Sequence, residues 1–300
     1  MQAITRKFWD VEGPTWILAV AIYAAWFLLM WFQAYIPWWA MIFLGGYVIA
    51  WQFSLQHETI HGFRGVPKWF RTLIAMPPLG LWFPYPMYRR SHSLHHRNTY
   101  LTVPGQDTET YYVKQADWAQ MGRLERAILL FNQTLVGRLL IGPLIRLYKL
   151  GQREISRIRN RDYINVPHWA LHVVLVGLLF WFVSGVCGMP WWQYILLVAY
   201  PGFSLGLLRA FIEHRAGPRP GRRVAAVESN TLFGLLFLYN NLHVAHHLRP
   251  TIPWYELPRF YRENRAKLLK HNDNFVFRGY WEITRQYLFR PVFVPVHPTV

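Results

Sequence analysis

The sequence is poor in cysteine, with Cys187 as the single thiol in 300 residues. One thiol cannot build a disulfide framework or a thiolate metal cage within a chain, and it cannot ligate an iron–sulfur cluster. A clear dinucleotide-binding fingerprint is also lacking. Any redox chemistry of this chain therefore needs electrons from a separate partner.

Acidic residues are scarce as well, with 15 Asp plus Glu against 32 Lys plus Arg and a formal charge of +17. This excess could suggest nucleic acid, but no recognition motif accompanies it. The basic residues instead lie between or after long apolar stretches, as in a membrane protein. We expect a lipid bilayer and no nucleic acid as the partner of this charge.

Four apolar stretches are long enough to cross a bilayer, because about 20 helical residues span a hydrocarbon core of roughly 30 Å. The predicted spans are Pro14–Ile36, Trp38–His57 with a continuation toward His61, Val166–Val186 and Pro190–Ile212. Very short connections join them in pairs, so they form two hairpins. The predicted fold is an all-α integral membrane protein with a histidine-rich cytoplasmic cap, and residues 1–300 form one domain.

The orientation follows from the distribution of basic residues. Neither hairpin connection carries a charged residue, whereas segment 63–166 carries 16 Lys plus Arg and segment 214–300 carries 13. By the positive-inside rule, both termini and both polar segments face the cytoplasm. We expect a bacterial inner-membrane protein with its active site on the cytoplasmic side.

Two further apolar stretches are weaker candidates for spans. Phe70–Tyr88 contains four prolines, so it is predicted to be a short helix under the membrane surface or a re-entrant segment. Ala127–Leu150 mixes Leu and Ile with basic residues and is predicted to be one amphipathic interfacial helix.

Eight of the thirteen histidines fall into three tight groups. The first group is His57 and His61, the second is His92, His95 and His96, and the third is His243, His246 and His247. Residues at i, i+3 and i+4 share one face of a helix, so each group can present its imidazoles in one direction. Imidazole nitrogen suits Fe, Zn, Cu and Ni, and eight imidazoles are about right for two ions.

The predicted topology places all three groups at the cytoplasmic side. His214, at the end of the fourth span, is a ninth candidate ligand. His168 and His172 stand apart at the start of the third span and are left out of the site. His271 and His297 are isolated and are expected on the surface.

The three groups resemble the histidine boxes of the membrane fatty-acid desaturase and hydroxylase superfamily. The segments that carry the resemblance are QHETIHG (56–62), RRSHSLHHR (89–97), NNLHVAHH (240–247) and PTIPWYELP (250–258). The segment PGQDTE (104–109) is similar to the bacterial branch that includes dihydrorhizobitoxine desaturase, and also to carotenoid ketolases. The resemblance extends from the first span to about residue 265.

The resemblance implies two iron ions, O2 as co-substrate, and an external electron donor such as a ferredoxin, a cytochrome b5 or a rubredoxin-like protein. It carries over the eight grouped histidines as iron ligands and adds His214. Animal acyl-CoA desaturases have an asparagine four residues before that histidine, where this chain has Ala210. Either that contact is absent here, or Asn240 or Asn241 replaces it.

Carboxylates near the histidines are candidates for orienting the imidazoles by accepting their second N–H. These candidates are Glu58, Asp107, Glu109 and Glu213. Each of them could equally be solvated or paired with one of the many arginines. The aromatic residues Trp51, Phe53, Trp82 and Phe83 flank the histidine groups and are candidates for lining a substrate channel or for interfacial packing.

The preferred activity is desaturation of a fatty-acyl or other lipid-like chain. Hydroxylation or ketolation of a lipid or carotenoid is the first alternative, because the histidine groups alone do not decide between them. The branch resemblance also leaves open a small amino-acid-derived substrate. A distant alternative is an intramembrane zinc protease, since His57-Glu58-Thr59-Ile60-His61 matches H-E-x-x-H.

Overall fold

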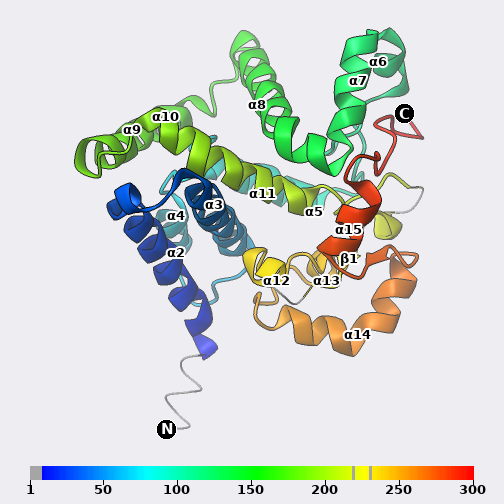
Figure 1. Cartoon of the computed structure of the whole chain (residues 1–300). Helices are drawn as coiled ribbons and strands as arrows, with labels where there is room; N and C mark the ends of the chain where they lie inside the picture. Colours follow the sequence, from blue (N-terminus) through cyan, green and yellow to red (C-terminus); the bar gives the residue numbers. More distant parts are fainter. Residues whose placement is uncertain (1–8, 218–219, 230–231) are drawn as a thin grey trace. The chain divides into compact units, whose positions relative to one another are not determined.

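The computed structural model describes residues 9–217, 220–229 and 232–300. Its described part is mostly helical, with a single two-stranded sheet (Figure 1). The first eight residues, which include the predicted cytoplasmic N-terminus, lie outside it. The chain divides into two compact units: Met1–Arg89 with Pro143–Gly206, and Arg90–Gly142 with Leu207–Val300. The prediction of a single domain stays a prediction.

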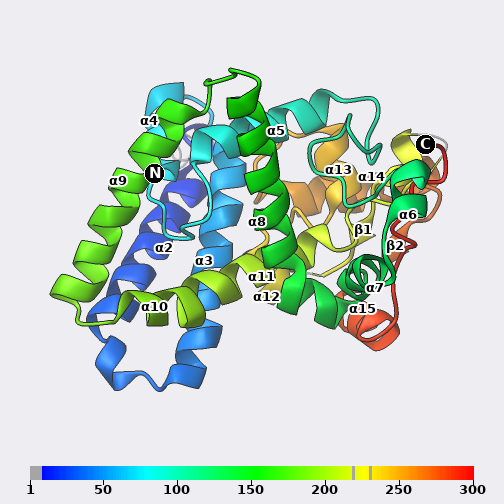
Figure 2. The same ribbon diagram turned by 90° about the horizontal axis from the view of Figure 1, so that it is seen from above.

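The first unit begins with a helical hairpin. Helices α2 (Gly13–Trp31) and α3 (Trp38–His61) are joined by the 3₁₀ turn η1 (Gln33–Tyr35) and lie side by side (Figure 2). Pro14 lies in the first turn of α2 and Pro37 directly precedes α3. At these positions the backbone N–H takes no part in the helical hydrogen bonds, so proline costs the helix nothing. Helix α4 (Lys68–Ala75) follows.

The second hairpin contains two π-helical turns. Helix α9 (Val166–Phe180) continues into η2 (Trp181–Val186), and the return is built from α10 (Trp191–Tyr194), the π turn η3 (Ile195–Ala199) and α11 (Tyr200–Ala210). Pro201 follows η3 and cannot donate to the carbonyl four residues earlier, which accounts for the altered winding there.

Three helices of the described residues are long and apolar enough to cross a membrane: Gly13–Trp31, Trp38–His61 and Val166–Val186. They correspond to the first three predicted spans. The fourth, Pro190–Ile212, is helical over 191–210 but broken by the π turn, and it is not among the three. Exposed apolar side chains such as Val173 and Leu178 line α9, as expected of a lipid-facing helix. The architecture is that of an integral membrane protein.

The predicted interfacial helix Ala127–Leu150 is wrong in its extent. Two helices occupy the region, α7 (Arg123–Asn132) and α8 (Leu135–Arg159), and they are bent by 115°. The side-chain oxygen of Thr134 accepts the N–H of Gly137 at 3.0 Å and so caps the start of α8. Counted as one bent span, the pair would raise the number of candidate spans among the described residues to four.

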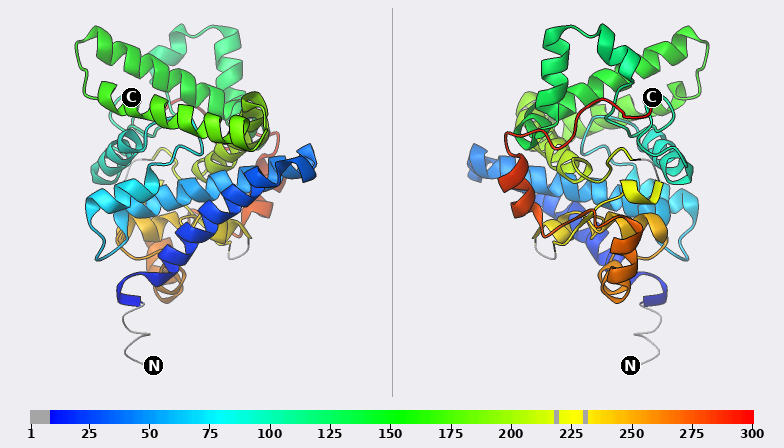
Figure 3. Two further views of the ribbon diagram at one scale, coloured as in Figure 1. Left: turned by 90° about the vertical axis from the view of Figure 1, so that its left-hand side faces the viewer. Right: turned by 90° about the vertical axis from the view of Figure 1, so that its right-hand side faces the viewer.

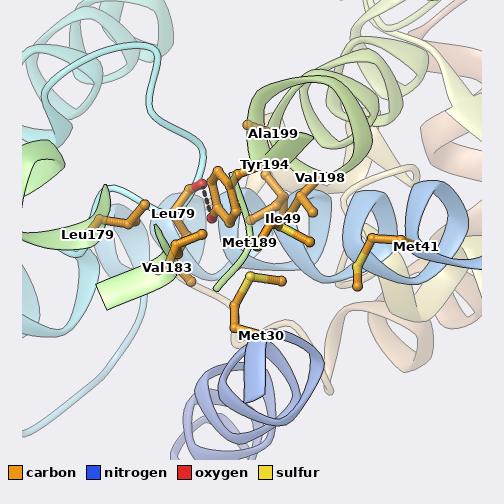
Figure 4. Packing of buried hydrophobic residues seen from close by; sticks show 10 residues of the cluster. All are labelled: Met30, Met41, Ile49, Leu79, Leu179, Val183, Met189, Tyr194, Val198 and Ala199. Carbon is orange, nitrogen blue, oxygen red and sulfur yellow. Dashed lines mark hydrogen bonds between the residues drawn. The ribbon is translucent and has the colours of Figure 1, made fainter. Parts of the chain in front are cut away.

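The proline-rich segment 76–84 runs through the core of the first unit outside any helix. Backbone N–H groups satisfy some of its carbonyls, as Leu81 N does for Pro78 O at 2.9 Å. Side chains of the surrounding helices satisfy three others and the carbonyl just before the segment. The pairs are Gln56 Nε2 to Ala75 O at 2.9 Å, Gln52 Nε2 to Pro77 O at 2.8 Å, Tyr194 OH to Leu79 O at 2.7 Å and His172 Nε2 to Leu81 O at 2.7 Å. Figure 4 shows the Tyr194–Leu79 bond among the apolar side chains of Met30, Ile49 and Val198. These bonds offset the cost of burying backbone polar groups.

The second unit contains several short elements. Besides α7, these elements are α5 (Tyr85–Arg97, whose first turn belongs to the first unit), α6 (Gln115–Gln120), η4 (Pro220–Arg223), α12 (Leu232–Leu236), α13 (His243–Leu248), α14 (Leu257–His271) and α15 (Tyr280–Tyr287). Three of them, α5, α13 and α14, carry histidines. Strand β1 (Ala226–Val227) pairs in parallel with β2 (Val276–Phe277). Buried residues such as Leu242, Val244, Tyr261 and Leu268 form its core and pack α13 against α14.

The last residues of the chain, which we call the 288–300 strap, run along the segment that precedes α6 (red in Figures 1 and 3). Val113 N donates to Pro295 O, His297 N to Val113 O and Gln115 N to Val300 O, each at 2.9 Å. Val292 N donates to Gln133 O at 2.8 Å. The strap is therefore an integral part of the second unit.

Candidate metal centre

The three histidine groups lie on helices, which is the arrangement that their spacing predicts. The first group ends α3, the second group ends α5, and the third group occupies α13. One face of each helix thus presents its imidazoles in one direction.

His57 and His61 lie one helical turn apart in the first unit. Their ligand nitrogens are within 4.8 Å of each other and their ring centroids are 5.0 Å apart. Just beyond them, the N–H groups of Phe63 and Arg64 donate to the buried carboxylate of Glu12 at 2.9 and 2.6 Å, which fixes the turn after α3. The predicted carboxylate Glu58 is buried against Gly62, where an added Cβ would lie 2.6 Å from Glu58 Oε1.

The second unit contains two clusters of imidazole nitrogens. The four-histidine cluster consists of His95, His214, His243 and His247, and the three-histidine cluster consists of His92, His96 and His246. In each cluster the ligand atoms lie within 4.8 Å of one another. These histidines come from α5, α13 and the bend after α11, so residues far apart in sequence converge.

The Nε2 atoms in these clusters are unusually close. In the four-histidine cluster, the Nε2 atoms of His95 and His214, of His214 and His243, and of His243 and His247 are each 3.1 Å apart. In the three-histidine cluster, Nε2 of His246 is 3.1 Å from Nε2 of His96.

Carboxylate and amide oxygens face the opposite ring nitrogens. Asp107 Oδ1 is 2.8 Å from His95 Nδ1, and Glu109 Oε1 is 3.0 Å from His92 Nδ1. His243 Nδ1 lies 3.1 Å from Asn240 Oδ1 and 3.3 Å from Glu213 Oε1. These oxygens are acceptors, so each Nδ1 carries the proton and each Nε2 turns a lone pair toward its cluster.

Such converging lone pairs repel each other unless a cation lies between them. His214 Nε2 and His243 Nε2 each have two nitrogen neighbours at 3.1 Å. An imidazole with its proton on Nδ1 has no proton on Nε2 to donate, so hydrogen bonds between the rings cannot account for these contacts. Metal–nitrogen bonds of about 2.1 Å at right angles place neighbouring nitrogens about 3.0 Å apart. The clusters therefore fit metal ions, and their all-imidazole donors suit a first-row transition metal.

Burial favours the neutral form of His214, His243 and His247, which is the form that a metal requires. Burial, together with the smaller effect of the neighbouring His95, lowers the pKa of His214 to about 3. It also holds the pKa of His243 and His247 well below the ordinary value. Burial also raises the pKa of the neighbouring Glu213 carboxyl, to about 7. Arg209, whose Nη1 is 2.7 Å from Glu213 Oε1, opposes this rise.

The two predicted asparagines have different positions. Asn240 faces the ring of His243, whereas Nδ2 of Asn241 donates to the carbonyls of Val227 and Ser229 at 2.6 and 3.1 Å. Asn241 therefore holds backbone rather than an imidazole. Asn240 is the one of the two that touches the centre.

His297 was expected on the surface, and that prediction is wrong. Its exposed fraction is 0%, and its ring nitrogens bond to Thr102 and Thr299. Nothing in its sequence neighbourhood distinguishes it from His271, which is exposed. The contact with Thr102 joins residues 195 positions apart, so local patterns could not reveal it.

The family model described as fatty acid desaturase matches residues 34–279, more than four fifths of the chain. That region contains the three histidine groups, His214 and every predicted orienting residue. No curated protein sequence matches the chain significantly.

Proposed function

The chain belongs to the fatty acid desaturase family, and from this premise we propose that it uses two iron ions and O2 to introduce a double bond into a fatty-acyl or other lipid-like chain. The observation that carries this proposal is the convergence of imidazole lone pairs in two histidine clusters. An all-imidazole set leaves coordination positions open, as metal-assisted oxygen chemistry requires.

We assign the nine predicted ligands to two ions. His95, His214, His243 and His247 would hold one iron, and His92, His96 and His246 would hold the other. His57 and His61 complete the second set, an assignment supported by their place in the first histidine group of the family region. The family asparagine has Ala210 at its position, and Asn240, which already contacts His243, is the candidate to replace it.

When bound, the two irons would supply the activation of O2 and the oxidising power needed to take hydrogen from an unactivated methylene. The residues of this chain contribute orientation and exclusion of water. Asp107, Glu109 and Asn240 fix the tautomers of the imidazoles, and His92, His95 and His243 are at most 2% exposed. Placement of the substrate then determines whether a second hydrogen is removed to give an alkene.

A lipid-like substrate fits both the family and the apolar first unit. Phe53, Phe83 and Phe203 form one aromatic cluster with Trp82, with ring centroids of successive neighbours 5.9 to 6.1 Å apart. We propose that this cluster contacts the substrate chain. A small amino-acid-derived substrate, as in the dihydrorhizobitoxine desaturase branch, is the competing possibility within the same chemistry.

Electrons would come from a ferredoxin, a cytochrome b5 or a rubredoxin-like protein. The basic segments 63–166 and 214–300 can attract an acidic donor as well as anionic lipid. Their charge also supports a cytoplasmic active site in a bacterial inner membrane.

The zinc-protease alternative does not account for the structure. The H-E-x-x-H motif involves only His57 and His61, so it leaves the four-histidine cluster without a role. Membership in the desaturase family further opposes it. Hydroxylation or ketolation uses the same centre and is distinguished by the product.

Iron analysis and mass spectrometry together test the proposal. The purified protein should hold close to two non-haem irons, and His243→Ala should abolish turnover and lower the iron content. Lipids and metabolites of cells with the gene should include a product lighter by two hydrogens. A product heavier by one oxygen from 18O2 would mean hydroxylation or ketolation, and one bound zinc in place of iron would reject the di-iron centre.

A further inference from the structure

His297 lies outside the region matched by the family model, yet hydrogen bonds connect it to the four-histidine cluster. Its Nε2 is 3.2 Å from Thr102 Oγ1, and its Nδ1 is 3.1 Å from Thr299 Oγ1. The backbone N–H of His297 donates to Val113 O at 2.9 Å. The ring is thus held by the 288–300 strap on one side and contacts the second unit's interior on the other.

The directions of these bonds agree with a single tautomer. Thr102 Oγ1 donates its proton to Leu101 O at 2.5 Å, so it accepts from His297 Nε2–H. His297 Nδ1 is then the acceptor for the hydroxyl and N–H of Thr299. Burial lowers the pKa of His297, with Arg223 acting in the same direction, so the ring is neutral.

Thr102 needs this support because its backbone has φ of +71°. A β-branched residue is disfavoured in the left-handed region, which costs on the order of 1–3 kcal/mol unless neighbouring contacts hold it there. The bond from His297 and that from Thr110 Oγ1 to Thr102 O, at 2.6 Å, hold both ends of the residue. In this conformation the N–H of Thr102 donates to Asp107 Oδ2 at 2.7 Å.

One more hydrogen bond connects Asp107 to the four-histidine cluster. The other oxygen of Asp107 is 2.8 Å from His95 Nδ1, and Nε2 of His95 points to His214. We propose that His297 is a positioning residue that aligns His95 through Thr102 and Asp107, which makes the strap a working part of the metal centre. This inference rests on the proposed function, in which the cluster binds iron.

Iron retention tests the role more directly than activity does. Full-length protein in lipid nanodiscs is loaded anaerobically with Fe2+, and the release of iron to a chelator is followed over time. His297→Ala removes the donor to Thr102, whereas His297→Gln retains an N–H that can reach it. His271→Ala is the matched control, because His271 is also a histidine near the end of the second unit but is exposed.

We expect two irons in the wild type and a selective change in the alanine variant. Loss of a hydrogen-bond partner of a metal ligand typically costs 10–100-fold in metal affinity, and His297 is further removed, so one of the two irons should leave about tenfold faster. The other iron should leave at the wild-type rate. His297→Gln should restore most of the retention, and His271→Ala should match the wild type.

Thr102→Val provides a second test if His297→Ala does not fold, because valine keeps the branched shape and removes the hydroxyl. It should accelerate the release of the same iron. Wild-type release rates in His297→Ala or in Thr102→Val, or equal acceleration of both irons, would overturn the positioning role and leave the di-iron proposal standing. A wild-type protein that binds no iron would overturn the proposed function and this role with it.

Discussion

Asp107 holds His95 with one carboxylate oxygen and the backbone of Thr102 with the other. Oδ1 lies 2.8 Å from His95 Nδ1, and Oδ2 accepts the Thr102 N–H at 2.7 Å. The side chains of Asp107 and His95 are 2% and 1% exposed, so water cannot readily replace either bond. The carboxylate therefore cannot rotate without losing a partner.

Asp107→Asn should keep the fold and lower activity about 10–100-fold, the range found for groups that orient metal ligands. The NH2 group of the Asn must take the place of either Oδ2, where it faces the Thr102 N–H, or Oδ1, where it faces the Glu109 N–H and His95 Nδ1. Either orientation sets one donor against another and loosens the alignment of His95. Iron content and desaturation rate measure the effect, and Glu263→Gln, 61% exposed, is the control. Two irons with full activity in Asp107→Asn would contradict the assignment.

His172→Leu should destabilise the first unit by about 1 kcal/mol, because it removes the donor at 2.7 Å from the partly buried carbonyl of Leu81. The midpoint of thermal unfolding in detergent reports the change. His168→Leu, on the same helix, alters a half-buried ring and should have a smaller effect. Equal midpoints for the two variants would show that the bond to the 76–84 segment contributes nothing.

Glu228 should stabilise the fold at neutral pH and not in acid. Burial alone would raise the pKa of Glu228, but hydrogen bonds from Arg265 and Tyr261, at 2.6 and 2.7 Å, lower it below the ordinary 4.5. A carboxyl with a lowered pKa contributes stability above its unfolded value, and this is lost as pH falls through the folded value.

Glu228→Gln should therefore cost about 1 kcal/mol at pH 7, a modest figure because the pair is partly exposed. The difference from the wild type should shrink as the pH is lowered below about 4. Thermal unfolding at a series of pH values measures it, with Glu263→Gln as the exposed reference. A pH-independent difference would show that the ionised carboxylate is not what stabilises this contact.

The cytoplasmic assignment can be tested by labelling single cysteines introduced into a Cys187→Ser background. Cysteines at Tyr35, in the first hairpin turn, and at Trp191, where α10 begins after the second turn, should react with an impermeant reagent from outside, because both positions are exposed. Cysteines at Lys114 and Lys270, both exposed in the second unit, should react only after the membrane is opened. Labelling of Lys114 and Lys270 from opposite sides would reject the topology.

Local sequence patterns predicted the helices and the histidine groups well, because both depend on spacing within a few turns. The bend between α7 and α8 was missed since the cap at Thr134 looks like an ordinary polar position within an apolar run. The fourth span was predicted from length and hydropathy, which do not register the π turn before Pro201.

The surroundings of the histidines were predictable in kind but not in pairing. Asp107 and Glu109 were candidates for orienting imidazoles, yet the sequence could not assign them to His95 and His92. Asn240 and Asn241 are neighbours in sequence, and only the backbone turn between them decides which faces His243. His297 was missed because its partner is remote in the chain.

The interleaving of the two units has a consequence for biosynthesis. The imidazoles of the four-histidine cluster are spread from His95 to His247, and the entire second hairpin lies in sequence between His95 and the other three. A nascent chain that has not reached α13 can offer a metal only two of those four imidazoles, so loading is a late event in synthesis. His297 is translated after every histidine of the two clusters, and proteolytic loss of the strap would leave those histidines in place but remove the support proposed for His95.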